Sequence, residues 1–139
     1  MEQGDVYAVL RTILQKVEGS PVVWRLDGSA NLRVQGVDVL VRDLDIKTNR
    51  FGWGVFKECL KEYFVKEYSQ EEILGDVAEF LVDGFPVVVI HNRYSMLHRI
   101  KKITFQGISL PVLPLREARE LYAALGQEKT VMVIDRHLG

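Results

Sequence analysis

The hydrophobic pattern of the chain changes between a helical period and a strand period. In residues 5–17, apolar side chains recur every three to four positions, which is typical of a helix with one buried face. Residues 22–26 instead form a short β-branched and aromatic run, which favours a strand. By these criteria the sequence predicts helices over 5–17, 30–35, 55–64, 115–125 and 128–138, and strands over 22–26, 39–46, 77–82, 86–91 and 108–113.

Turn and capping residues separate these segments. Asp83 and Gly84 lie between two strand runs and form a dipeptide that strongly favours a two-residue hairpin. Gly36 is expected to end the short helix 30–35, and Ser29 is expected to cap its beginning. The order of elements predicts an α+β (mixed α/β) fold, in which helices flank a mixed sheet, with residues 1–139 forming a single domain.

Composition narrows the class of protein. The 139 residues carry 18 basic and 19 acidic side chains, a net charge of -1, and 47% of them are hydrophobic, so we expect a globular domain rather than a strongly electrostatic nucleic-acid binder. No apolar run is long enough to span a bilayer, and the N-terminal residues do not resemble an export signal. We therefore expect no membrane contact and a cytoplasmic location.

The cysteine and the histidines suggest no site of their own. The single cysteine, Cys59, excludes an internal disulfide, and its helical spacing favours a core position. The three histidines have neither zinc-ligand spacing nor a nucleophile motif around them.

The chemistry of the chain is concentrated in residues 27–46. Gly28 and Ser29 lie in a predicted strand-to-helix turn, where a residue without a Cβ allows close approach of a phosphate to the backbone. Asp43 and Asp45 alternate with Leu44 and Ile46, so both carboxylates are expected on one face of a strand, about 7 Å apart. Two such carboxylates suit one or two Mg²⁺ ions bound together with nucleotide phosphates.

Taken together, these residues resemble the signature of the polymerase-beta-like nucleotidyltransferases, in particular their small single-domain and antibiotic-modifying members. The resemblance rests on the Gly28-Ser29 pair, a spacer of thirteen residues and the segment 43–46, and it extends to Trp24, the Asp83-Gly84 hairpin and the segment 110–113. It implies a nucleotidyltransferase-like mixed sheet. It also implies that Gly28 and Ser29 hold a triphosphate, and that Asp43 and Asp45 ligate Mg²⁺ (or Mn²⁺) for transfer of a nucleoside monophosphate from an NTP to a hydroxyl.

The chain departs from this family pattern in two places. The third carboxylate of the family aligns near Val88, in a stretch with no acid, and Glu79 or Asp83 could replace it only if the hairpin register allows. Because that acid often deprotonates the acceptor hydroxyl in the family, its absence is expected to affect turnover more than nucleotide binding. Asp27 stands where the family usually has an apolar residue.

Other charged residues admit simpler interpretations. Asp43 and Asp45 could be solvent-facing acids of an edge strand, and Gly28-Ser29 an ordinary capped turn. Lys47 is expected in solvent at the strand end, on the face of Leu44 and Ile46, rather than at a phosphate. A basic cluster with interleaved aromatic residues favours a solvated face, with RNA or an acidic partner as the alternative; it comprises Arg93, Tyr94, His98, Arg99, Lys101, Lys102 and Phe105.

The sequence therefore predicts a metal-dependent nucleotidyltransferase with Asp43 and Asp45 as catalytic metal ligands and Gly28 and Ser29 as nucleotide-binding residues. Its partners would be an NTP, an unidentified hydroxyl acceptor and a second copy of the chain or another protein. The alternative is a catalytically silent binding module of the same fold, for example the antitoxin-like half of a pair, which the missing third carboxylate favours.

Overall fold

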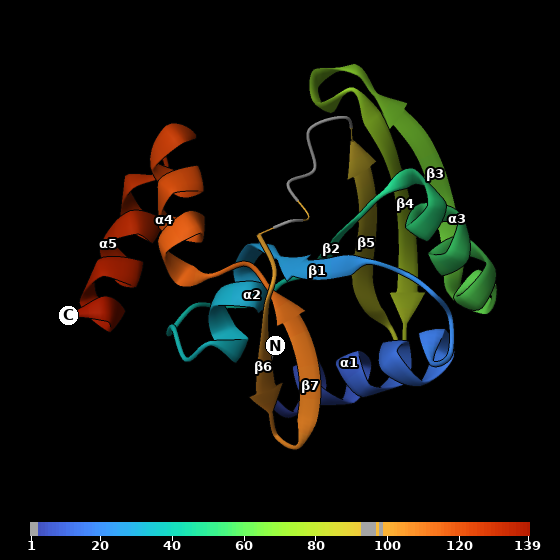
Figure 1. The fold of residues 1–139 in the computed structure, drawn as a ribbon, viewed down its shortest axis with the longest axis horizontal. Helices are drawn as coiled ribbons and strands as arrows, with labels where there is room; N and C mark the ends of the chain where they lie inside the picture. The colour runs from blue at the N-terminus through green and yellow to red at the C-terminus, as the bar shows by residue number, and fades with distance from the viewer. Residues whose placement is uncertain (1–2, 93–96, 98) are drawn as a thin grey trace.

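The computed structural model describes residues 3–92, 97 and 99–139, and these residues form five α-helices and one seven-stranded mixed sheet (Figure 1). The predicted α+β class is confirmed. The helices are α1 (Gln3–Val17), α2 (Gly28–Val34), α3 (Arg50–Cys59), α4 (Leu115–Ala124) and α5 (Glu128–Leu138). The strands are β1 (Trp24–Asp27), β2 (Leu44–Thr48), β3 (Phe64–Gln70), β4 (Gly75–Val82), β5 (Phe85–Asn92), β6 (Lys101–Phe105) and β7 (Ile108–Val112).

The sheet has the strand order β3-β4-β5-β2-β1-β7-β6. In its centre, β1 pairs antiparallel with β2 and parallel with β7, while β2 pairs parallel with β5. The outer strands are antiparallel to their neighbours: β3 pairs with β4, β4 with β5, and β6 with β7. This order brings the end of β1, where the chain enters α2, beside the first residues of β2.

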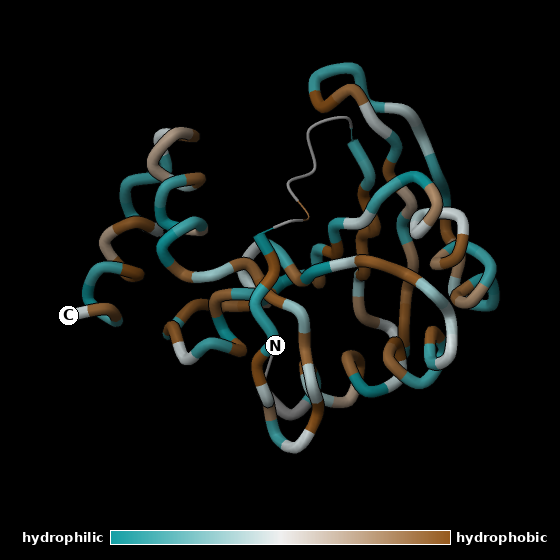
Figure 2. Tube along the Cα trace, in the orientation of Figure 1, coloured by the Kyte–Doolittle hydropathy of each residue, from teal (hydrophilic) through white to brown (hydrophobic). Residues whose placement is uncertain are grey.

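The main hydrophobic core lies on the face of the sheet that carries Leu44 and Ile46. Both side chains are fully buried, together with Leu10 and Ile13 of α1 and Phe56 of α3. In Figure 2 the central strand β5 is drawn largely in hydrophobic colours, whereas the edge strand β3 is mixed. No helix among the described residues is long and apolar enough to cross a bilayer.

A second, smaller core joins α2 to the C-terminal helices. Leu32, Leu113, Ala118 and Ile134 are buried in it. Figure 1 shows α4 and α5 as a helical hairpin at one end of the molecule. Asn31 of α2, which is 1% exposed, connects α2 to the segment that leads into this hairpin. Its amide donates to the carbonyl oxygen of Leu113 at 3.0 Å, and its Oδ1 accepts from the amide of Leu113 at 3.0 Å.

Most sequence expectations agree with these elements. The helices expected at 5–17, 115–125 and 128–138 and the strands expected at 22–26, 77–82, 86–91 and 108–113 are present with small shifts at their ends. The Asp83-Gly84 hairpin is confirmed, because Val82 pairs with Phe85. Both turn residues have positive φ, as this turn requires. Cys59 is half-buried and packs against the main core, so its expected core position is confirmed in part.

Two expected elements are wrong in extent. The strand expected over 39–46 begins only at Leu44, so Asp43 precedes it. The helix expected over 55–64 is α3, which begins at Arg50 because the Asn49 side chain accepts a hydrogen bond from the Gly52 amide. Glycines within α3 weaken its sequence signal. Phe64 belongs to β3 instead.

Strands β3 and β6 are not predicted from the sequence, because neither strand alternates clearly between core and solvent. Every residue of β3 is exposed, so its composition carries no buried face to detect. In β6 only Phe105 is buried. Both are edge strands, for which burial provides little signal.

The substitution Asn31→Asp is expected to lower the free energy of unfolding by about 2–3 kcal/mol at pH 7, because a buried carboxylate oxygen would replace the donor that faces the Leu113 carbonyl oxygen, which would keep only its hydrogen bond from Gln35. Urea unfolding followed by circular dichroism measures this change. The matched control is Asn49→Asp, where an acid still caps α3 and the cost stays within about 0.5 kcal/mol. Equal effects of both substitutions would contradict this role of Asn31.

Candidate active site

The candidate site is built on neighbouring residues of β1 and β2. In the antiparallel pair of these strands, Asp27 lies directly opposite Asp45. Leu44 and Ile46 are fully buried while Asp43 and Asp45 are half-buried, so the predicted alternation of carboxylates and aliphatic side chains is confirmed. We call the pair Asp27 and Asp45 the acidic rung.

Gly28 brings the backbone turn into contact with this rung. It has a φ of 67°, in the left-handed region, and a Cβ added there would collide with Oδ2 of Asp45. The Asp45 carboxylate therefore packs against the backbone at the start of α2. The two predicted parts of the site, the Gly28-Ser29 turn and the aspartates, converge at this point.

The expectation that Ser29 caps α2 is wrong. The N-cap residue is Asp27, and its side chain makes no capping hydrogen bond. Instead Arg25 holds both oxygens of the Asp27 carboxylate, with Nε donating to Oδ1 at 2.6 Å and Nη2 donating to Oδ2 at 3.3 Å. Both side chains are buried. The pairing explains how a buried acid is tolerated at position 27, and it leaves the first amides of α2 without a side-chain cap.

The acidic rung concentrates negative charge. Burial, followed by the nearby charges of Asp43 and Asp27, raises the pKa of the Asp45 carboxyl to about 7, while the charge of Lys47 acts in the opposite direction. The charge reaches α4 as well: burial and then the charges of Asp45 and Asp27 raise the pKa of the Tyr122 phenol. Protein groups alone thus leave Asp45 in an unfavourable environment for a carboxylate at neutral pH.

The register places Val88 where a third acid would complete the site. Val88 lies opposite Asp45 on β5, on the side of β2 away from Asp27. Glu79 lies opposite Val88 on β4, so it shares this face one strand further out. Its carboxylate accepts a hydrogen bond from the hydroxyl of Tyr68 at 2.7 Å. No acid therefore stands beside Asp45 on β5, in agreement with the sequence.

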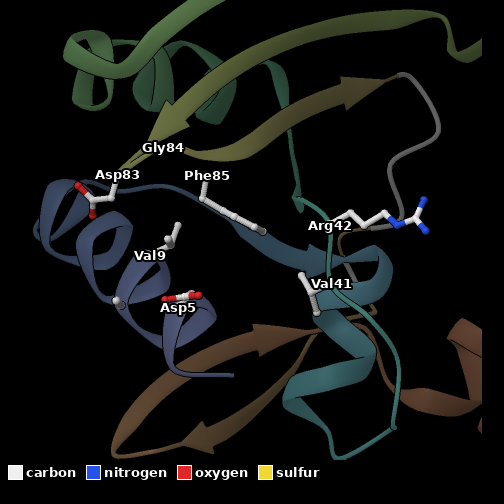
Figure 3. Close-up of a pocket in the computed structure, with 8 residues that line it drawn as sticks. Asp5, Val9, Val41, Arg42, Asp83, Gly84 and Phe85 are labelled. Atoms are coloured by element: carbon white, nitrogen blue, oxygen red, sulfur yellow. The ribbon is translucent and has the colours of Figure 1, made fainter. Parts of the chain in front are cut away.

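Asp83 faces away from the aspartates. Its Oδ2 accepts a hydrogen bond from Oγ1 of Thr12 in α1, and α1 covers the face of the sheet opposite Asp45. Asp83 lies beside α1 (Figure 3), where it lines a cavity of about 530 Å³ together with Val9, Val41 and Phe85. The suggestion that Asp83 replaces the third acid is therefore wrong for this arrangement.

The expected orientation of Lys47 is wrong, and Arg25 and Tyr122 are site residues that the sequence did not predict. Positions 43, 45 and 47 are each two apart, so Lys47 lies on the carboxylate face and not on that of Leu44, and it stands opposite Arg25. The same two-residue spacing in Arg25 and Asp27 could have indicated their pairing. The contribution of Tyr122 depends on how α4 folds back, for which the local sequence has no signal.

The expected basic cluster does not form an aromatic binding face among the residues that the structure covers. Arg93, Tyr94 and His98 lie outside the described residues. Phe105 is 7% exposed and packs against Tyr7, so it does not present its ring to a ligand. Arg99 forms an ion pair with Glu117, and Lys101 and Lys102 are exposed on β6.

The donor set of the site fits a magnesium ion that shares its ligands with a substrate. Within residues 3–92, 97 and 99–139, no group of three or more His, Cys, Asp or Glu side chains is placed to enclose a metal. Asp43 and Asp45 would supply two carboxylates. This suits Mg²⁺, which commonly binds one or two carboxylates and completes its shell with phosphate oxygens and water.

Comparison with solved structures identifies the fold. The chain is similar to TM1012, a proposed nucleotidyltransferase of Thermotoga maritima, with a TM-score of 0.79 and 24% identity over 99% of this chain and 95% of that one. It is also similar to the antibiotic-resistance factor ANT(2″)-Ia in solution, with a TM-score of 0.69 and 11% identity over 100% of this chain and 86% of that one.

A crystal structure of ANT(2″)-Ia in complex with adenylyl-2″-tobramycin gives a TM-score of 0.65 and 10% identity over 99% of this chain and 91% of that one. The expected nucleotidyltransferase fold is therefore confirmed. No protein-family model and no curated protein matches the sequence.

Adding a methyl group at Gly28 tests the contact with Asp45. Gly28→Ala is expected to destabilise the protein by about 2–4 kcal/mol, because it combines backbone strain with a collision. Gly126→Ala is the control, since Gly126 also has positive φ but a Cβ there meets nothing within 4 Å, so it costs about 1 kcal/mol. When Gly28→Ala is introduced into Asp45→Ala, its cost in unfolding free energy should fall to that of the control, because the colliding carboxylate is gone. A persistent excess in thermal unfolding would show that Asp45 is not what Gly28 accommodates.

Asp45→Asn is expected to stabilise the metal-free protein at alkaline pH. The folded-state pKa of Asp45 lies above its unfolded value of 3.8, so the wild type loses stability as the pH rises from about 4 to 7, and an amide does not. At pH 8 in EDTA the free energy of unfolding of Asp45→Asn should exceed that of wild type by about 1–3 kcal/mol, and this difference should vanish near pH 4. Melting temperatures across this range measure it, with the exposed Asp38→Asn as control. A variant less stable than wild type at pH 8 would contradict an Asp45 carboxylate that is destabilised by burial and by its acidic neighbours.

Proposed function

We propose that this chain binds a nucleoside triphosphate with Mg²⁺ and transfers its nucleoside monophosphate to a hydroxyl group. The observation that carries the proposal is the packing of the Asp45 carboxylate against Gly28. This packing supports a site in which a phosphate lies against the backbone of the Gly28 turn, next to Asp45, one of the two carboxylates that we propose as metal ligands. A solvated edge strand and an ordinary turn would not require this contact.

Each residue has a defined task in this proposal. Gly28 lets the phosphate chain lie against the backbone, and the uncapped amides at the start of α2, together with the Ser29 hydroxyl, donate hydrogen bonds to it. Asp43 and Asp45 hold the metal. The bound Mg²⁺ supplies positive charge that offsets the phosphate oxygens and the acidic rung. Arg25 fixes the Asp27 carboxylate, so that it does not compete with phosphate for the amides of α2.

In the transfer, the acceptor hydroxyl oxygen forms a bond to the α-phosphorus. The bond between this phosphorus and the oxygen that bridges to the β-phosphate breaks, and pyrophosphate leaves with the electron pair. Because Val88 occupies the position beside Asp45 on β5, no acid there takes the hydroxyl proton, which passes to water. We therefore expect slow turnover with ordinary nucleotide binding.

The proposed acceptor is a compound that carries a hydroxyl group. ANT(2″)-Ia, one of the proteins of similar fold, is seen with adenylylated tobramycin, an antibiotic. In this chain a pocket next to Arg25, the partner of Asp27, is also lined by Arg99, Glu117, Glu120 and Leu121. This mixed lining could accommodate a polar acceptor, and a survey of hydroxyl compounds would begin with polar ones.

Calorimetric titration of the four NTPs, with and without Mg²⁺, tests the proposal. We expect metal-dependent binding of at least one NTP, weakened at least tenfold by Asp43→Asn and by Asp45→Asn because each removes a metal ligand. Asp38→Asn removes an exposed acid that pairs only with Arg33 among the described residues, and it should bind as the wild type does.

Two results would count against the proposal. Binding that survives both aspartate substitutions would place the nucleotide elsewhere. Absence of binding to all four NTPs would favour the catalytically silent module of the same fold.

A further inference from the structure

The second rung of the β1–β2 pair carries two positive charges. Lys47 lies directly opposite Arg25, one pleat along from the acidic rung of Asp27 and Asp45 and on the same face. Like charges placed directly opposite each other on paired strands destabilise the pair. Arg25 makes two hydrogen bonds to Asp27, whereas Lys47 makes no ion pair with a described residue and acts on Asp45 only through its charge.

Lys47 differs from the other half-buried cations of the described chain. Its ammonium has no hydrogen bond or ion pair with any described residue, although the side chain is half-buried. By contrast, Arg33 pairs with Asp38, and Lys57 with Glu67. The charge of Lys47 already lowers the pKa of the neighbouring Asp45 carboxyl, and its N–H donors make no hydrogen bond with a described residue, so they are available to an anion bound on this face. The place of Lys47 on the carboxylate face, opposite a second cation and with these donors unused, indicates that Lys47 receives an anionic ligand.

The direction of the strands indicates which phosphate group of a nucleotide Lys47 would bind. Since β1 and β2 are antiparallel, Gly28 and Ser29 lie beyond the acidic rung toward Asp43, whereas Lys47 lies on the opposite side of Asp45. A phosphate chain held at Gly28 and Ser29 by its β- and γ-phosphates extends over Asp45 toward Lys47. The lysine has a flexible four-carbon stem, which allows its ammonium to turn back toward Asp45.

We propose that Lys47 binds the α-phosphate of the nucleotide, and so holds the phosphorus at which transfer occurs. This inference rests on the proposed function and adds a residue to it. The phosphate chain is then held at both ends, by Gly28 and Ser29 on the leaving side and by Lys47 on the side from which the acceptor approaches. The ammonium also offsets the repulsion between the incoming phosphates and the two aspartates, Asp43 and Asp45.

Three variants test the assignment. Lys47→Met removes the charge and keeps much of the stem, Lys47→Arg keeps the charge, and Lys66→Met is the matched control. Lys66 lies on the same face, because its β4 partner Glu79 stands opposite Val88, but it is on the edge strand β3 and its ammonium lies over the Tyr68 ring. The binding of α,β-methylene ATP, AMP and pyrophosphate, each with Mg²⁺, is measured by calorimetry.

If Lys47 contacts the α-phosphate, Lys47→Met should weaken α,β-methylene ATP and AMP about tenfold or more and leave pyrophosphate within about twofold. Lys47→Arg should stay within about threefold of wild type, and Lys66→Met should be unchanged. Equal loss of all three ligands in Lys47→Met would overturn the assignment, since it would indicate a general effect of charge. Unchanged binding in Lys47→Met would overturn it as well.

The outcome also separates this inference from the function on which it rests. Wild-type protein that binds neither α,β-methylene ATP nor pyrophosphate would overturn both. Wild-type binding that needs Asp43 and Asp45 but not Lys47 would overturn the assignment of Lys47 alone.

Discussion

The candidate site depends on the contact between the Asp45 carboxylate and the backbone at Gly28. This contact exists because β1 and β2 pair antiparallel with Asp27 opposite Asp45. It also requires a residue at position 28 that has no Cβ and adopts a positive φ without strain, which glycine does. Every other feature of the site is arranged around it. Arg25 neutralises Asp27 from within β1, Lys47 follows on the next rung, and Tyr122 approaches from α4.

This arrangement places the negatively charged carboxylates of Asp27 and Asp45 side by side on strands that are held firmly by the core. The core face of β2 is fully buried against α1 and α3, so the strand cannot turn to relieve its carboxylates. Asn31 fixes α2 to the segment that leads into α4, which keeps the start of α2 in place. Clusters of like charge that cost stability are common where a protein binds an ion or a charged substrate, because the ligand offsets the repulsion.

The sequence predicted the class of fold from the strand period and turn chemistry, and it predicted the Gly28-Ser29 turn and the two aspartates as parts of one site from the spacing of the motif. Their contact depends on the pairing of β1 with β2, which local rules do not determine. The sequence could not predict β3, whose residues are exposed and therefore show no periodicity. It also gave no account of Asp27, because the partner that allows this acid to be buried is identified only once Arg25 is known to point to the same face. The role of Tyr122 depends on the return of α4 over the sheet, which is long-range packing.

The central claim is that phosphate and metal bind at one point, between Gly28 and the aspartates. Paramagnetic broadening of amide resonances by Mn²⁺ in the presence of an NTP tests it most directly. The account predicts that the amides of Gly28, Ser29, Leu44 and Asp45 broaden first, and that those of the Asp83-Gly84 hairpin, which faces α1, remain sharp. Broadening centred on the hairpin, or uniform weak broadening across the chain, would contradict it.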